Sequence, residues 1–102
     1  MPVGRVSESD VSIAVTKYLH GKPGRTATIY QIKRAIPNYL ALSDADRVQS
    51  VTRPNEEMWE QQVRNIVSHR NTPGNFIFEG RLEHAPRRLM LTDAGAIYAA
   101  TL

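Results

Sequence analysis

An amphipathic segment followed by a short two-stranded ribbon is the feature that most constrains this fold. In residues 54–71 the apolar side chains recur at helical spacing and make one stripe of Trp59, Val63, Ile66 and Val67. The opposite side carries hydrogen-bonding side chains of the kind that read base edges and phosphate oxygens, namely Gln61, Arg64, Asn65 and Ser68. We expect residues 55–71 to form a helix with this polar side left bare, as in a DNA-reading helix.

Length and composition agree with one soluble domain. The chain has 102 residues and no cysteine, which excludes disulfides and thiolate metal sites. No apolar run approaches the ~20 residues that cross a bilayer, and residues 1–10 lack the apolar stretch of a signal peptide. Residues 1–6 are expected to be flexible. The sequence therefore predicts a single cytoplasmic domain over residues 1–102, which is expected at the nucleoid if the helix at residues 55–71 reads DNA.

Net charge permits a nucleic-acid partner without identifying one. The chain has thirteen Lys and Arg residues and ten Asp and Glu residues. This mildly basic composition is also found in proteins with an ordinary solvated surface. The positions of the charges say more. Three glutamates, Glu56, Glu57 and Glu60, fall at the expected start of the third helix, where carboxylates favour the positive end of the helix dipole.

The first half of the chain predicts two helices separated by a short extended piece. Residues 7–10 offer a helix start, and the apolar stripe that follows ends at His20 and Gly21. Residues 26–28 suit only a short strand. Thr28 and Gln31 have the spacing of a capping box for a second helix, which Pro37 should stop near residue 35 or 36.

The second half predicts a polar connector, the third helix, a hairpin and a closing helix. Residues 43–55 have no clear period, and Thr72, Pro73 and Gly74 cannot continue the helix. Residues 76–78 look like a strand that residues 82–84 extend past a bulge at Gly80, with residues 89–91 as its partner. Thr92 is a good N-cap for the closing helix.

This order of elements indicates an α+β fold of the winged helix-turn-helix type. Three helices would be followed by a β-hairpin wing over residues 76–91 and by a C-terminal helix. In such domains the third helix docks in the major groove and the hairpin touches the backbone beside it.

Three runs of residues carry a resemblance to a known family. The run Met-Trp-Glu-Gln-Gln-Val-Arg-Asn-Ile-Val-Ser-His at 58–69, the segment 74–80 and the ending Leu-Thr-Asp-Ala-Gly at 91–95 resemble the winged-helix domains of bacterial restriction systems. They are most similar to the N-terminal domain of Mrr-type restriction endonucleases and to modules beside HNH nucleases. The resemblance covers residues 28–99.

The resemblance implies a bacterial DNA-binding module of restriction-modification or transcription regulation. It implies that Trp59 and Val63 anchor the core, that Arg64 and its neighbours face DNA, and that residues 91–95 form the strand-to-helix junction. Family members usually attach this module to a nuclease domain. This sequence stops at Leu102, so we expect either a free-standing binder, or a fragment or standalone relative, with a nuclease or a second copy as the candidate partner.

For double-stranded DNA the expected contacts fall into three groups. Arg64 would fork onto a guanine, with Gln61 or Asn65 on an adenine and Ser68 beside them. Phosphates would be held by Arg53, Arg70, Lys33 and Arg34, and the wing would contribute Arg81, His84, Arg87 and Arg88. The competing interpretation of the wing is a solvated hairpin whose charges serve solubility.

Catalysis is not expected. Asp44 and Asp46 have no nearby lysine to complete a nuclease site, and the three histidines, His20, His69 and His84, lack metal-ligand spacing. No metal or cofactor is predicted. The alternative function is protein–protein interaction without DNA, in which the first and closing helices pair two copies into a homodimer through Ala94, Ile97, Tyr98 and Leu102.

Overall fold

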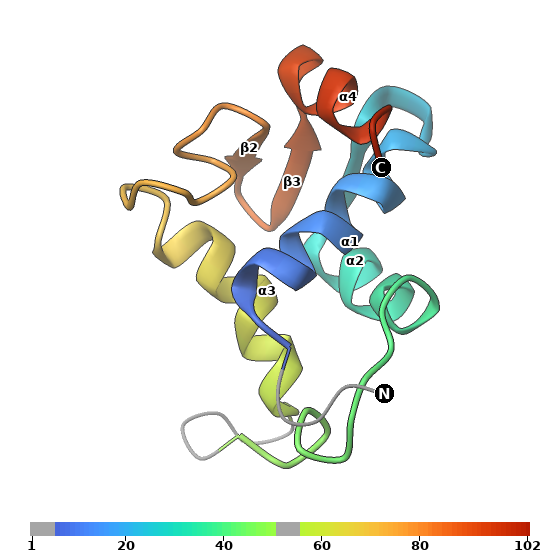
Figure 1. Ribbon diagram of the computed structural model, residues 1–102, viewed down its shortest axis with the longest axis vertical. Helices are drawn as coiled ribbons and strands as arrows, with labels where there is room; N and C mark the ends of the chain where they lie inside the picture. Colours follow the sequence, from blue (N-terminus) through green and yellow to red (C-terminus); the bar gives the residue numbers. More distant parts are fainter. Residues whose placement is uncertain (1–5, 51–55) are drawn as a thin grey trace.

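The computed structural model describes residues 6–50 and 56–102 and shows an α+β architecture (Figure 1). In these ranges the chain forms four α-helices and a three-stranded antiparallel sheet. The elements follow in the order α1 (Glu8–His20), β1 (Thr26–Thr28), α2 (Ile29–Ala35), α3 (Met58–Ser68), β2 (Leu82–Ala85), β3 (Arg88–Leu91) and α4 (Asp93–Ala99).

Helix starts and stops lie where local side-chain chemistry places them. Ser7 and Asp10 form a capping box at α1, and the Thr28 hydroxyl accepts the Gln31 amide at 3.1 Å in a second capping box at α2. Pro37 stops α2 after Ala35, and a 3₁₀ turn, Ile36–Asn38, follows. The predictions for these two helices and for the strand between them are confirmed.

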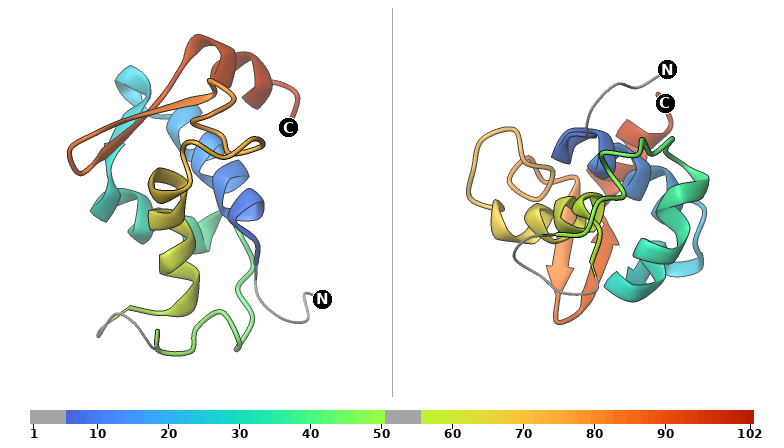
Figure 2. Two further views of the ribbon diagram at one scale, coloured as in Figure 1. Left: turned by 90° about the vertical axis from the view of Figure 1, so that its left-hand side faces the viewer. Right: turned by 90° about the horizontal axis from the view of Figure 1, so that it is seen from below.

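The sheet places β3 in the middle, with β1 on one side and β2 on the other. Thr28 lies opposite Arg88 on the first edge, and Ala85 lies opposite Arg88 on the second. Because residues alternate in direction along β3, Leu89 and Leu91 are buried against the helices. The turn that joins β2 to β3 therefore projects beside the start of α2 (Figure 2).

The core lies between the sheet and the helices, with α1 across its middle (Figure 1). Leu19 from α1, Ile32 from α2 and Ile66 from α3 are fully buried, and Trp59 is only 5% exposed. The apolar stripe of α3 thus packs inward as its spacing predicts, which orients the rest of that helix.

Residues 76–78 are not a strand, contrary to the prediction. The hairpin begins at Leu82, so the wing is shorter than residues 76–91. The cause is Asn75, whose buried side-chain oxygen accepts the amides of Ile77 at 2.8 Å and Phe78 at 3.2 Å. This local capping folds the segment into consecutive turns and diverts its amides from a sheet ladder.

The third helix is also shorter than residues 55–71. It begins after Glu57, whose amide donates to the Glu60 side chain at 2.7 Å, and it ends at Ser68. Residue 54, where the predicted amphipathic segment begins, lies outside the described residues. Glu56 precedes the helix and does not join Glu57 and Glu60 at its first turn.

The connector before α3 is ordered by one buried carboxylate where it is described. Asp46 is 1% exposed, and its side chain accepts the amides of Val6 at 2.7 Å and Ser43 at 2.8 Å. Val6 is therefore buried, whereas the prediction had grouped it with a flexible end; residues 1–5 lie outside the described part. In the described ranges we find no helix long and apolar enough to cross a membrane.

Candidate nucleic-acid interface

The polar side of α3 points away from the core but is partly covered. Ser68 is exposed, whereas Gln61, Arg64 and Asn65 are half-buried. The Gln61 amide nitrogen donates to the Ser50 hydroxyl at 2.5 Å, and the Asn65 amide nitrogen donates to Gln62 at 3.2 Å. The expectation of a bare polar side therefore holds for Ser68 alone. The connector, which has no periodic pattern, covers the first turns of the helix.

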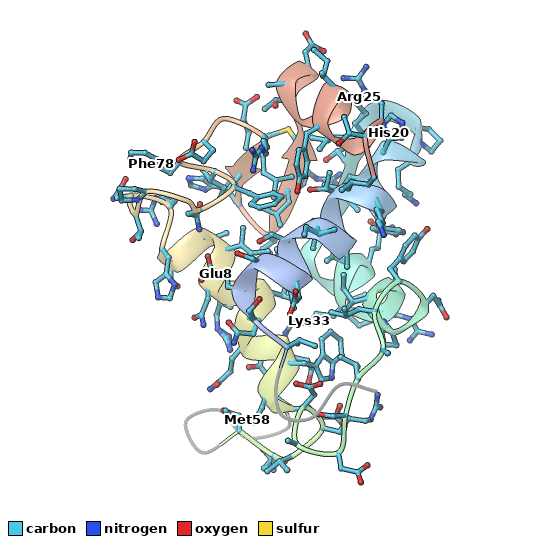
Figure 3. The ribbon with its side chains drawn as sticks, in the orientation of Figure 1. Glu8, His20, Arg25, Lys33, Met58 and Phe78 are labelled. Atoms are coloured by element: carbon cyan, nitrogen blue, oxygen red, sulfur yellow. The ribbon has the colours of Figure 1, made fainter. Side chains whose placement is uncertain are left out.

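Glu56 joins α2 to α3 through two cations. Its carboxylate accepts from Lys33 Nζ at 2.8 Å and forms an ion pair with the Arg64 guanidinium. The side chains of Lys33, Glu56 and Arg64 are 22%, 16% and 28% exposed, so water screens this group less than it screens a surface pair. Figure 3 labels Lys33, which α2 contributes to this group.

A cleft separates the start of α2 from the hairpin turn. Its volume is about 450 Å³, and its lining residues are Thr28, Ile29, Tyr30, Lys33 and Arg87. Tyr30 is 68% exposed, so its ring forms an open wall of the cleft. Arg87 lies in the turn with φ +60°, and its carbonyl accepts the Ile29 amide at 2.9 Å, which ties the turn to α2.

These contacts join three elements along one side of the molecule. Lys33 shares Glu56 with Arg64 and shares the cleft with Arg87, so α3, α2 and the hairpin turn each contribute one cation. We call Arg64, Lys33 and Arg87 the basic strip. The side views show α2 and the hairpin turn on the same side of α3 (Figure 2).

Several predicted DNA contacts lie elsewhere or have partners within the chain. Arg81 precedes β2, and its guanidinium stacks over the rings of Tyr98 at 4.2 Å and Phe76 at 5.0 Å. It belongs to the packing of α4, because residues 76–81 turn back toward that helix. Arg88 donates to the Thr26 hydroxyl at 3.1 Å across the sheet.

Three further predicted contacts are on the surface, namely Arg34, Arg70 and His84. Arg34 donates to the Tyr30 hydroxyl at 3.3 Å, and Arg70 donates to the Val67 carbonyl at 2.9 Å beyond the end of α3. His84 is exposed on β2. Arg53 lies outside the described residues.

Sequence reasoning missed Tyr30 and Glu56 as members of this surface. Tyr30 could have been found from the sequence. It lies outside the apolar stripe of Ile29, Ile32 and Ile36 and follows a helix cap, so an exposed position in the first turn of the helix was predictable. Glu56 could not, because its partner Lys33 lies 23 positions earlier and only the folded chain brings the two together.

Within the described ranges no three histidine or carboxylate side chains gather where they could hold a metal ion. Comparisons with protein-family models, with curated proteins and with solved structures find no significant match to the chain. The resemblance to restriction-associated domains stays a prediction.

Proposed function

We propose that this chain is a winged-helix module that binds double-stranded DNA in a restriction-associated or regulatory role. In this proposal α3 is the recognition helix and the β2–β3 hairpin is the wing. The order of elements supports it, since two helices with a short strand between them precede α3 and a hairpin follows. The sheet order β1-β3-β2 also supports it, because it holds the hairpin turn next to α2.

The basic strip is the observation that carries the proposal. Three elements that are distant in sequence present their cations along one side, and the strip includes one cation of the proposed wing. Phosphates of a duplex follow one another along a groove, so cations spaced across adjacent elements can hold several of them at once. Arg34 and Arg70 would extend the same phosphate contacts.

The exposed side of α3 would read bases. Ser68 is accessible as it stands, whereas Gln61 and Asn65 would exchange their partners Ser50 and Gln62 for base edges. That exchange requires only side-chain rotation for Asn65, because its partner lies on the same helix. Binding alone is the mechanism, and any cleavage would belong to a nuclease partner.

A fluorescence titration with labelled duplexes tests the proposal. We expect the affinity to fall by about 10²-fold or more between about 50 and 200 mM salt, as several phosphate contacts require. Single-stranded DNA of the same length is the control and should bind more weakly. No binding to any duplex, with modified and unmodified bases both tried, would contradict the proposal.

Exposed apolar side chains near the C-terminus favour a second candidate function, the pairing of two copies. Ile97 of α4 is 73% exposed, and Leu102 is 50% exposed. Such side chains gain free energy when a partner removes them from water. Sedimentation equilibrium tests this idea: the chain should dimerise and Ile97→Glu should abolish the dimer, whereas a monomer at high concentration would contradict it.

A further inference from the structure

We propose that the Glu56 carboxylate competes with DNA phosphates for Lys33 and Arg64. This competition makes DNA binding depend on base contacts as well as on charge. The inference rests on the proposed function and adds a residue that sets its specificity. Glu56 is the acidic side chain that occupies the basic strip at the junction of α2 and α3.

Both carboxylate oxygens of Glu56 are engaged by cations. Lys33 Nζ lies 2.8 Å from Oε2, Arg64 Nη1 lies 3.5 Å from the same oxygen, and Arg64 Nη2 donates to Oε1. A guanidinium and an ammonium would engage two phosphate oxygens in the same way. The carboxylate therefore occupies the donors that a phosphate of the DNA backbone would use.

The backbone around Glu56 holds the carboxylate in this position. The Glu56 carbonyl accepts the Ser50 amide at 2.7 Å, and Gln49 and Glu57 form an isolated antiparallel bridge beside it. Gln61 of α3 donates to Ser50, so the connector is tied to the helix it precedes. Glu56 is thus held at the strip by its main chain as well as by its two ion pairs.

A phosphate that reaches this point must replace or share an existing ion pair. Counterion release then contributes less, because the Glu56 carboxylate already neutralises one of the two positive charges of Lys33 and Arg64. Non-specific binding, which depends almost wholly on that contribution, is weakened most. A site that also offers base contacts keeps the additional free energy of those contacts.

The variant Glu56→Gln tests this inference, because glutamine keeps the shape of the side chain and removes its charge. In duplex titrations we expect its affinity for a random-sequence duplex to rise by about five- to tenfold near 0.1 M salt. The plot of log affinity against log salt should steepen by about one, the value of one further phosphate contact. Thermal unfolding of the same sample reports whether the variant is folded.

The matched control is Asp93→Asn, which changes the net charge equally. Asp93 is fully exposed at the start of α4, where it pairs with Arg25 rather than with the basic strip. Its affinity and salt slope should stay close to those of the wild type, because exposed charges act weakly beyond a Debye length.

Three results separate the possible failures. A folded Glu56→Gln variant with unchanged or weaker binding overturns the inference while the proposed function stands. If neither protein binds any duplex at low salt, the proposed function fails. If Glu56→Gln does not fold, Glu56→Asp provides the test. The shorter aspartate carboxylate should not reach both cations, so the affinity for a random-sequence duplex should rise. Unchanged affinity of this variant would overturn the inference.

Discussion

The arginine at the base of the β2–β3 hairpin, Arg81, and the arginine at its tip, Arg87, have different surroundings. At the base, Arg81 lies over two aromatic rings, and its carbonyl accepts the Thr92 amide at 3.1 Å. At the tip, Arg87 is exposed, and its side chain makes no ion pair with any residue in the described ranges. Arg81 therefore serves stability, whereas Arg87 remains available to a partner.

The strongest test of the base is Gly95→Ala. Gly95 is buried, and a Cβ there would overlap the Arg81 carbonyl oxygen and lie 2.5 Å from Leu91 Cδ1. We expect the free energy of unfolding to fall by about 3 kcal/mol in a denaturant titration. Gly21→Ala is the control, since its Cβ meets nothing closer than 3.8 Å and should change stability by less than about 0.5 kcal/mol. Equal stability of the two variants would contradict the packing described for the base.

Removing the Asn75 side chain should loosen the turns that lead into the base. Its nitrogen donates to the Ile66 carbonyl at 2.9 Å, and its oxygen accepts two amides of the following turn. Asn75→Ala should lower the free energy of unfolding by about 2 kcal/mol, because buried polar groups lose their partners. The exposed Asn71 in the same segment is the control, and Asn71→Ala should be close to neutral. A similar loss in both variants would show that Asn75 does not organise the turns.

Arg81→Met should lower the stability of the protein without changing its affinity for DNA. Methionine keeps an unbranched stem over the Tyr98 and Phe76 rings but removes the cation, which should cost about 1 kcal/mol of unfolding free energy. Duplex affinity should not change, because Arg81 lies outside the basic strip. Arg81→Lys, which retains a cation, should lose less. If the folded Arg81→Met variant bound DNA more weakly, Arg81 would have to be counted among the residues that contact DNA.

Arg87→Asn should affect DNA binding and leave stability nearly unchanged. Asparagine tolerates the positive φ of this turn, so the variant removes the charge without straining the backbone. We expect affinity to fall by about fivefold and the salt slope to decrease by about one. The matched control is Arg25→Asn. Arg25 also has a positive φ, +54°, but it precedes the end of β1 away from the hairpin tip, and it pairs with Asp93. Equal losses in both variants would contradict a specific role for the tip.

The sequence predicted the features that depend on neighbouring residues. Capping pairs such as Thr28 with Gln31, the stop at Pro37 and the inward stripe of Trp59 are set within a few positions, and the structure confirms them. The α+β class and the order of the helices followed from the same local signals.

What the sequence did not predict depends on contacts between distant segments. The roles of Arg81 and Arg87 cannot be separated by residue type, because only folding brings Tyr98 against one and leaves the other exposed. The cover over α3 was missed for the same reason, since Ser50 lies in a connector without periodicity and Glu56 was predicted to belong to the helix itself. Asn75 misled the strand prediction because its side chain outcompetes a sheet ladder that the apolar residues 76–78 suggest.

An amide chemical-shift titration of the isotope-labelled protein with a duplex would locate the DNA-binding surface residue by residue. If the surface formed by α2, α3 and the hairpin tip binds DNA, the largest shifts should fall in residues 28–34, 61–68 and 85–88. The turns before the hairpin and the start of α4, residues 76–82 and 92–98, should change little and serve as the internal control. Shifts confined to α4, or no shifts at low salt, would contradict DNA binding by α2, α3 and the hairpin tip.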